Sequence, residues 1–155
     1  MKHRYLFTLE ITPLEVGKTY DKLPSHLTLM SRFFSELSPE ELTEKVAPLF
    51  RSATPIELKF GETTKLGPKE LTVHMVDNTD QLKELHNNLK TLLGSLNVEY
   101  EYPQFTGDNH RPHVTWREGD NIKAGDTKTS IATYLIEVVD GKRVIRSKLN
   151  ISVLL

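Results

Sequence analysis

Short segments in which apolar and polar residues alternate recur along almost the whole chain, whereas only two segments follow helical spacing. Alternation with a period of two is typical of strands. Strands are therefore expected at residues 5–11, 26–30, 56–60, 71–75, 112–116, 131–139 and 143–154. The last two flank Asp140-Gly141, a hairpin turn signature. Because strands and helices do not alternate regularly, we expect an α+β fold and not a doubly wound parallel sheet.

The first helical segment has a strong start signal. Ser38 is a good N-cap, Pro39 suits the first helical position, and Glu41 stands three residues after the cap. This helix is expected to run to about Ala47. Pro48 removes a backbone donor and clashes one turn back, so residues 48–51 are expected to form a kinked last turn.

The second helical segment is defined by leucines and is expected to begin at Asn78 or Thr79 and to stop near Gly94. Its apolar residues at helical spacing are Leu82, Leu85, Leu89, Leu92, Leu93 and Leu96.

Length and composition narrow the class of protein. A chain of 155 residues is the usual size of one domain, and we expect residues 1–155 to form one. The absence of cysteine excludes disulfides, thiolate nucleophiles and cysteine-ligated zinc, and it agrees with a cytoplasmic location. No apolar run reaches the length of a membrane span, and the first residues lack a signal peptide core. A net charge of −1 argues against a duplex DNA-binding surface.

One short chemical pattern occurs twice. His26-Leu27-Thr28-Leu29 and His113-Val114-Thr115-Trp116 each contain a histidine, an apolar residue, a threonine and an apolar residue within an expected strand. Residues two apart in a strand project to the same side, about 6.6 to 6.8 Å from one another. Each copy thus presents one imidazole and one hydroxyl to the same space.

This combination suits the cleavage of a phosphodiester. One imidazole can take a proton from the nucleophile while the other gives a proton to the leaving oxygen, since unperturbed imidazole titrates near pH 6.5. Each threonine can donate a hydrogen bond to a phosphate oxygen. A single His-x-Thr segment arises easily by chance at a strand edge, but two copies in opposite halves favour function. No metal or other cofactor is required by this chemistry.

Other histidines have simpler interpretations. Asp108, His110 and His113 can be read as part of a metal site, but no helix sets their spacing and Pro112 restricts it. His74 is expected at the surface or at the rim of a groove, and His86 on the solvated side of the second helix. The absence of a Walker-type glycine-rich loop argues against nucleoside triphosphate hydrolysis. A basic stripe on the final hairpin is either a solvated face or an RNA approach surface; it consists of Lys142, Arg143, Arg146 and Lys148.

The paired motif and the order of elements resemble the two-histidine (2H) phosphoesterases, which include 2'-5' RNA ligase-like proteins and 2',3'-cyclic phosphodiesterases. The resemblance spans nearly the whole chain. It implies a two-lobed fold of antiparallel sheets with approximate two-fold symmetry, in which both motifs lie at the floor of a central groove. It also implies hydrolysis of 2',3'-cyclic phosphates or cleavage and joining of 2'-5' linkages. His26 and His113 would be acid and base, in either order, and Thr28 and Thr115 would hold the phosphate.

Substrate-binding groups do not carry over from the family, so candidates come from the residues themselves. Tyr5 and Phe7 can stack on a base if their face of the first strand lines the groove; otherwise they belong to the core. Arg111 can meet a second or terminal phosphate, or be an ordinary loop arginine. An aromatic group before the second motif forms either a base wall or packing; its members are Tyr100, Tyr102 and Phe105.

The sequence thus predicts a metal-independent phosphodiesterase, expected to be a monomer, that acts on RNA termini or small cyclic nucleotides. Two alternatives stay open. One is an RNA-binding module of the same fold with little catalytic role, and the other is a phosphodiesterase for cyclic oligonucleotide signals.

Overall fold

The computed structural model describes residues 2–115 and 121–151. Trp116 of the second motif and residues 152–154 of the last expected strand lie outside the described residues. The elements in chain order are β1 (His3–Glu10), β2 (Thr19–Tyr20), β3 (His26–Ser35), α1 (Pro39–Ser52), β4 (Ile56–Leu66), β5 (Leu71–Val76), α2 (Asp80–Ser95), β6 (Glu99–Tyr100), η1 (Pro103–Phe105), η2 (Gly107–Asn109), β7 (His113–Thr115), β8 (Thr127–Ser130), β9 (Ala132–Val139) and β10 (Lys142–Asn150).

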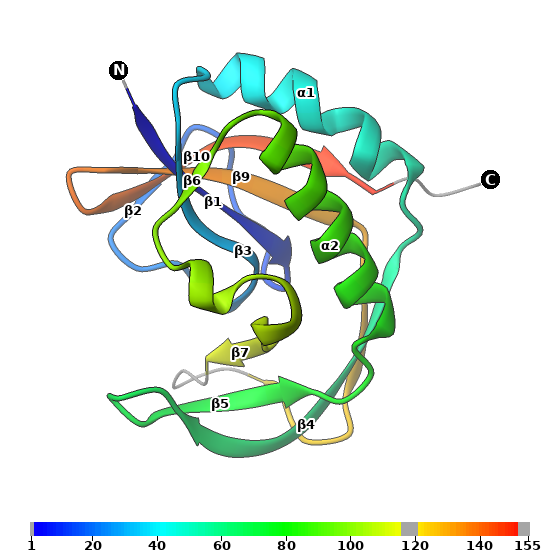
Figure 1. The fold of residues 1–155 in the computed structure, drawn as a ribbon. Helices are drawn as coiled ribbons and strands as arrows, with labels where there is room; N and C mark the ends of the chain where they lie inside the picture. Colours follow the sequence, from blue (N-terminus) through cyan, green and yellow to red (C-terminus); the bar gives the residue numbers. More distant parts are fainter. Residues whose placement is uncertain (1, 116–120, 152–155) are drawn as a thin grey trace.

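The strands pair antiparallel in the order β2-β10-β9-β1-β3-β7-β5-β4-β8, with β6 added beside β3. Figure 1 shows this sheet curling from β10 and β9 at the top, through β3 and β7, to β5 and β4 at the bottom. Two helices with a curled antiparallel sheet confirm the expected α+β class. None of the helices in the described ranges is long and apolar enough to cross a membrane.

The sheet has two arms, one formed by β2, β10, β9, β1 and β3 and the other by β7, β5, β4 and β8. The two arms meet where β3 pairs with β7. The residues opposite each other at this junction are Leu27 and Val114, the apolar middle residues of the two motifs. Both side chains are fully buried in the main core, which also contains the apolar faces of α1 and α2. The junction between the arms therefore brings the two motifs together and fixes which way they face.

The helix α1 begins as the sequence predicts. Ser38 accepts a hydrogen bond from the Glu41 amide, and the Glu41 side chain accepts one from the Ser38 amide, which completes a capping box. The helix then continues through Pro48 to Ser52, beyond the expected end at Ala47. Leu42, Val46 and Phe50 form its buried stripe, and this burial outweighs the hydrogen bond that proline cannot donate.

The final hairpin also follows its signature. Asp140 and Gly141 both adopt positive φ, 52° and 77°, as the two central residues of a type I′ turn must. The end of α2 differs slightly from the expectation, because Gly94 lies inside the helix and the last helical residue is Ser95.

The expected surface position of His74 is wrong. The strand β5 pairs with β7 so that His74 lies opposite Val114, and the His74 side chain is only 4% exposed. Its Nδ1 bonds the Gly61 carbonyl oxygen at 2.9 Å. Val73 and Met75 lie opposite Thr115 and His113, so the apolar face of β5 flanks the motifs.

Candidate active site

The four polar motif side chains share one face of the sheet. Because Leu27 pairs with Val114 in an antiparallel ladder, His26 lies across from Thr115, and Thr28 lies across from His113. Alternation places all four on the face opposite the two buried apolar residues. Directly opposite Cα atoms in such a pair are about 4.5 to 5.5 Å apart, and diagonal residues such as the two histidines are about 7 to 8 Å apart.

Both motif imidazoles are oriented by the same backbone contact. The His26 Nδ1 bonds the carbonyl oxygen of Pro24 at 2.9 Å, and the His113 Nδ1 bonds that of Arg111 at 2.7 Å. A carbonyl oxygen only accepts, so each Nδ1 must carry the proton. Each Nε2 is then a proton acceptor when the ring is neutral and a donor when it is charged. This geometry equips both rings for acid and base chemistry through the same atom.

Two irregularities in β3 lie next to the motif. Thr8 pairs with Thr28 but Phe7 pairs with Met30, so Leu29 is an extra residue on the β3 side. A second register shift follows between Phe7 and Tyr5. Bulges of this kind bend a strand and re-aim its side chains, and they are common beside functional sites.

A cleft of about 560 Å³ lies over this face, and three of the four motif residues line it: His26, Thr28 and Thr115. The charged residues that line it are Lys22, Arg32, Lys69 and Arg143. No carboxylate is among the described residues of its wall. The chain as a whole has a net charge of −1, so the described lining of this cleft is more positive than the chain average.

The structure corrects the expectation that Tyr5 and Phe7 stack on a substrate base. Both side chains are fully buried among the helices, on the face opposite the motif residues. The Tyr5 hydroxyl donates to the Leu37 carbonyl oxygen, as a buried phenol should. Tyr102, from the aromatic group before the second motif, lines the cleft instead.

Arg111 is exposed and lies two residues before the start of β7, between the half-buried His110 and the buried Pro112. Its carbonyl oxygen orients His113, as described above. The backbone of this residue thus has a clear place in the site, and a role for its guanidinium group stays a prediction.

A carboxylate that the sequence pattern did not indicate, that of Glu10, belongs to the strand beside the first motif. Glu10 pairs directly with His26 across β1 and β3. Its carboxylate accepts a short hydrogen bond from the Tyr134 hydroxyl and lies 3.5 Å from the Lys148 ammonium. Burial, followed by this hydrogen bond, raises the pKa of Tyr134 to about 12, so the phenol stays protonated and keeps donating. Only the strand register reveals this neighbour.

Two further histidines lie beneath the first motif, contrary to the solvated position expected for His86. The rings of His86 and His110 stack with centroids 4.1 Å apart and an interplanar angle of 4°. The His86 side chain is 1% exposed, and its Nδ1 bonds the Leu29 carbonyl oxygen at 2.7 Å. The His110 Nε2 bonds the Thr28 carbonyl oxygen at 3.0 Å. Burial, helped by His86, lowers the pKa of His110 to about 4.

These contacts also bear on the metal-site interpretation of Asp108, His110 and His113. The Nε2 of His110 is engaged by a backbone carbonyl, and its ring lies flat on His86. Within residues 2–115 and 121–151, no three histidine, aspartate or glutamate side chains are grouped so that they could hold a metal ion.

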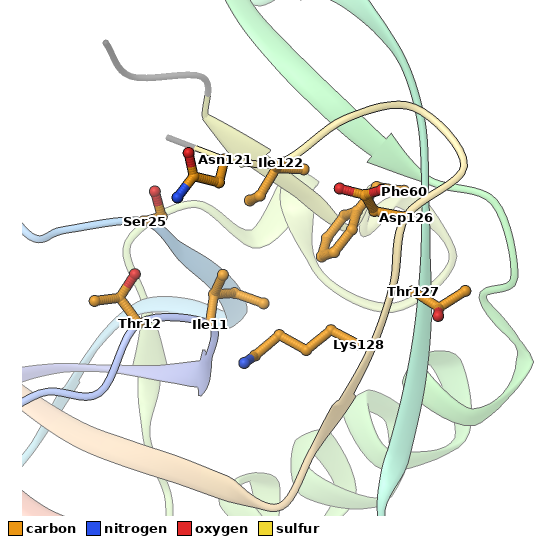
Figure 2. Close-up of a pocket in the computed structure, with 9 residues that line it drawn as sticks. All are labelled: Ile11, Thr12, Ser25, Phe60, Asn121, Ile122, Asp126, Thr127 and Lys128. Carbon is orange, nitrogen blue, oxygen red and sulfur yellow. The ribbon is translucent and has the colours of Figure 1, made fainter. Parts of the chain in front are cut away.

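A second pocket, of about 420 Å³, is lined at the start of β3 by Ser25, the neighbour of His26. Figure 2 shows Ser25 on one side of this pocket and Phe60 with Asp126 on the other, while the Lys128 side chain extends from β8 towards Ile11. The Ser25 hydroxyl is buried and has no hydrogen-bond partner in the described part of the chain. None of the four polar motif residues, all of which are described, lines this pocket. The cationic cleft is therefore the better candidate site.

The curled antiparallel sheet and the paired His-x-Thr motifs on one face define a protein of the two-histidine phosphoesterase class. The family model of the 2'-5' RNA ligase superfamily matches residues 9–143, and the chain belongs to this family. A search among curated proteins finds no match.

Solved structures share the fold at low sequence identity. E. coli LigT complexed with 3'-AMP matches with a TM-score of 0.67 and 13% identity, over 99% of this chain and 100% of that one. A protein described as a phosphoesterase matches with a TM-score of 0.63 and 14% identity, over 99% and 100% of the two chains. TT0787 of Thermus thermophilus matches with a TM-score of 0.55 and 16% identity, over 96% and 97%.

Proposed function

We propose that this protein is a phosphodiesterase, acting as one domain, that opens 2',3'-cyclic phosphates or cleaves 2'-5' linkages at RNA ends or in small nucleotides. The observation that carries this proposal is the pairing of Leu27 with Val114, which puts two imidazoles and two hydroxyls on one face. Membership of the 2'-5' RNA ligase superfamily supports the reaction class. E. coli LigT has been solved with 3'-AMP, ATP and NADP+, which supports a nucleotide as the ligand of this chain.

The proposed hydrolysis uses His26 and His113 as base and acid. The neutral imidazole takes a proton from water through Nε2 while the water oxygen forms a bond to phosphorus. The bond from phosphorus to the 3' oxygen breaks, and the charged imidazole gives its Nε2 proton to that oxygen. The products are a 2'-phosphate and a 3'-hydroxyl group, so atoms and charge balance.

The threonines act on the phosphate in this proposal. The hydroxyls of Thr28 and Thr115 donate hydrogen bonds to the non-bridging oxygens, where negative charge is redistributed in the transition state. The four cations of the cleft wall favour a substrate with negative charge close to the reacting phosphorus.

The test is turnover of a nucleoside 2',3'-cyclic phosphate and of a 2'-5' linked oligonucleotide by purified protein in the presence of a chelator. We expect hydrolysis of at least one substrate, and a loss of about 10³-fold or more in kcat for His26→Ala and for His113→Ala. His3→Ala removes a histidine at the opposite end of β1 from Glu10, the residue that pairs with His26; the His3 ring bonds Glu137 there, and the change should leave kcat unchanged. Unchanged turnover in both motif variants would rule out the mechanism. RNA binding that survives both variants, with no turnover in the wild type, would favour a binding module.

A further inference from the structure

The cleft wall carries more positive charge than one reacting phosphate would neutralise. Lys22 comes from the loop after β2, Arg32 from β3, Lys69 from the β4–β5 turn and Arg143 from β10. Four separate segments thus supply cations to a cleft whose described lining has no carboxylate. One phosphate held by two imidazoles and two hydroxyls does not balance this charge.

Arg143 is fixed while the two lysines are exposed. The Arg143 guanidinium donates to the carbonyl oxygens of Asp21 and Gly141, at 3.1 and 3.0 Å, which holds it beside the loop that carries Lys22. The carboxylates next to these lysines in sequence are Asp21 and Glu70; both are exposed, Asp21 lies 3.7 Å from Lys142, and neither lines the cleft. Lys22 and Lys69 are therefore exposed cations of a wall whose described lining contains no acidic group.

We propose that the cleft contains a second phosphate subsite, formed by Lys22, Lys69 and Arg143, so that the favoured substrate carries a further phosphate besides the scissile one. This inference rests on the proposed function, because it takes the motif residues as the site of the reacting phosphate. The substrate class is then a nucleotide chain end or a nucleotide with a 5'-phosphate, in preference to a bare nucleoside cyclic phosphate.

Binding of product analogues tests the subsite independently of turnover. Adenosine 2'-monophosphate and adenosine 2',5'-bisphosphate differ by one phosphate, and their dissociation constants can be measured by calorimetry at low salt. We expect the bisphosphate to bind about tenfold more tightly, because a charge-assisted contact in a partly enclosed site is worth about that factor. Lys22→Gln/Lys69→Gln should reduce the difference to within about twofold. Lys83→Gln, an exposed change on α2, is the matched control and should keep it.

Equal affinities for the two ligands in the wild type would overturn the subsite, as would a difference that persists in the double variant. Either result leaves the proposed function intact if cyclic phosphates are still hydrolysed. Absence of hydrolysis with a preserved tenfold difference would instead reject the reaction while keeping the subsite.

The stacked histidines under β3 carry a second, independent inference. The carbonyl oxygens they bind belong to consecutive residues, Thr28 and Leu29, at the β3 bulge. Leu29 has no partner in β1 because it is the extra residue of that bulge. On the other side, the His86 Nε2 accepts a hydrogen bond from the Gly107 amide at 2.9 Å. His86 therefore bridges β3 to the η2 segment, which continues through His110 to the second motif.

We propose that His86 and His110 are positioning residues that hold Thr28 and the segment leading to His113 in a fixed relation. Each neutral ring donates a hydrogen bond to one carbonyl oxygen. The stacking of the rings fixes the position of one donor relative to the other. The charged or titratable groups that face the pair are Lys90 from α2 and His113 from β7. No carboxylate in the described part of the chain hydrogen-bonds to either ring. A positive charge on the pair is thus uncompensated, and the pair works in its neutral form.

His110→Phe keeps an aromatic ring on His86 but removes the donor to Thr28, whereas His110→Gln keeps a donor at a similar reach. We expect kcat on a cyclic phosphate to fall about tenfold in His110→Phe, with little change in KM, and to recover in His110→Gln. His74→Phe is the control for stability, since His74 is also buried and bonds one carbonyl oxygen. Equal losses of kcat in His110→Phe and His74→Phe would show a merely structural role and overturn the proposal.

If His110→Phe does not fold, the tautomers of the two rings in the wild-type protein test the same proposal. Nitrogen-15 spectra of the imidazoles should show protonated Nδ1 in His86 and protonated Nε2 in His110, with the His110 ring still neutral at pH 5.5. Titration of His110 near pH 6.5, or the opposite tautomer in either ring, would overturn the proposal.

Discussion

His26 and His113, 87 residues apart in the chain, make the same hydrogen bond. In each, Nδ1 donates to the backbone carbonyl oxygen two residues earlier, that of Pro24 or Arg111. The two rings therefore have the same tautomer when neutral, with the proton on Nδ1. An approximate symmetry of the two motifs thus extends from the sequence to the orientation of the side chains. In the proposed mechanism, this likeness allows either ring to serve as acid or as base.

The threonine hydroxyls provide the first prediction. Thr28→Val and Thr115→Val remove one donor each while keeping the shape of the side chain, and we expect kcat to fall about 100-fold in each. Thr28→Ser and Thr115→Ser keep the hydroxyl and should retain most of the activity. Steady-state kinetics on a nucleoside 2',3'-cyclic phosphate checks this. Valine variants as active as the serine variants would exclude hydrogen bonding to the phosphate.

The second prediction separates the core aromatic residues from the cleft. Phe7→Ala should lower the free energy of unfolding by about 3 to 5 kcal/mol, because it leaves a cavity in the core. Tyr5→Phe removes the hydrogen bond to the Leu37 carbonyl oxygen and should cost about 1 kcal/mol. Neither change should alter KM by more than about twofold, since both side chains are fully buried. Urea denaturation and kinetics on the same samples test both parts.

Tyr102 provides the contrasting third prediction. It lines the cleft and is partly exposed, so Tyr102→Ala should raise KM for a nucleotide substrate. Loss of a stacked base is worth about 1 to 3 kcal/mol, which corresponds to a factor of about 5 to 150 in KM. Tyr102→Phe keeps the ring and should bind normally. An unchanged KM in Tyr102→Ala would remove this residue from the substrate site.

The fourth prediction concerns stability and pH. The pKa of His110 is lowered to about 4 in the folded protein, against about 6.5 in the unfolded chain. The unfolded state therefore binds more protons between these values, and this contribution is fully present above pH 6.5 and is lost as the pH falls towards 4. The full effect is on the order of 3 kcal/mol. Urea denaturation at pH 7.5 and 5.0 should show a larger loss in the wild type than in His110→Phe; equal losses would contradict the assignment.

Local signals in the sequence predicted local structure well. Ser38 and Glu41 predict the capping box because their side chains accept hydrogen bonds from backbone amides in the same helical turn. Asp140-Gly141 predicts the hairpin because both residues adopt the positive φ that the turn requires. Alternation alone placed each motif histidine on the same face as its own threonine, whereas the meeting of the two motifs depends on the pairing of β3 with β7. In each case the physical cause lies within the segment.

The predicted positions of buried residues were wrong where both faces of a strand or helix are covered by other parts of the protein. Both faces of β5 have neighbours, so its alternation does not tell which side is the interior, and His74 was placed on the wrong one. His86 follows the same helical stripe as Leu82, Leu89 and Leu93, and this spacing was an available signal for its burial. Tyr5 and Phe7 were ambiguous for the same reason as His74.

The other residues of the candidate site are brought together only by the tertiary fold. Lys22, Arg32, Lys69 and Arg143 belong to four separate segments, and only the curled sheet gathers them around one cleft. The contact of Glu10 with the first motif depends on the β1–β3 register, and the bulge at Leu29 shifts that register. No pattern within one segment carries this information.

The central claim is that the two motif imidazoles hold one phosphate between them. Nitrogen-15 spectra of the imidazoles during titration with inorganic phosphate test it most directly, with His26→Ala and His113→Ala used to assign the signals. We expect the Nε2 signals of both rings to shift together along one binding curve with a single dissociation constant. Shifts in only one ring, or two curves with different constants, would contradict it.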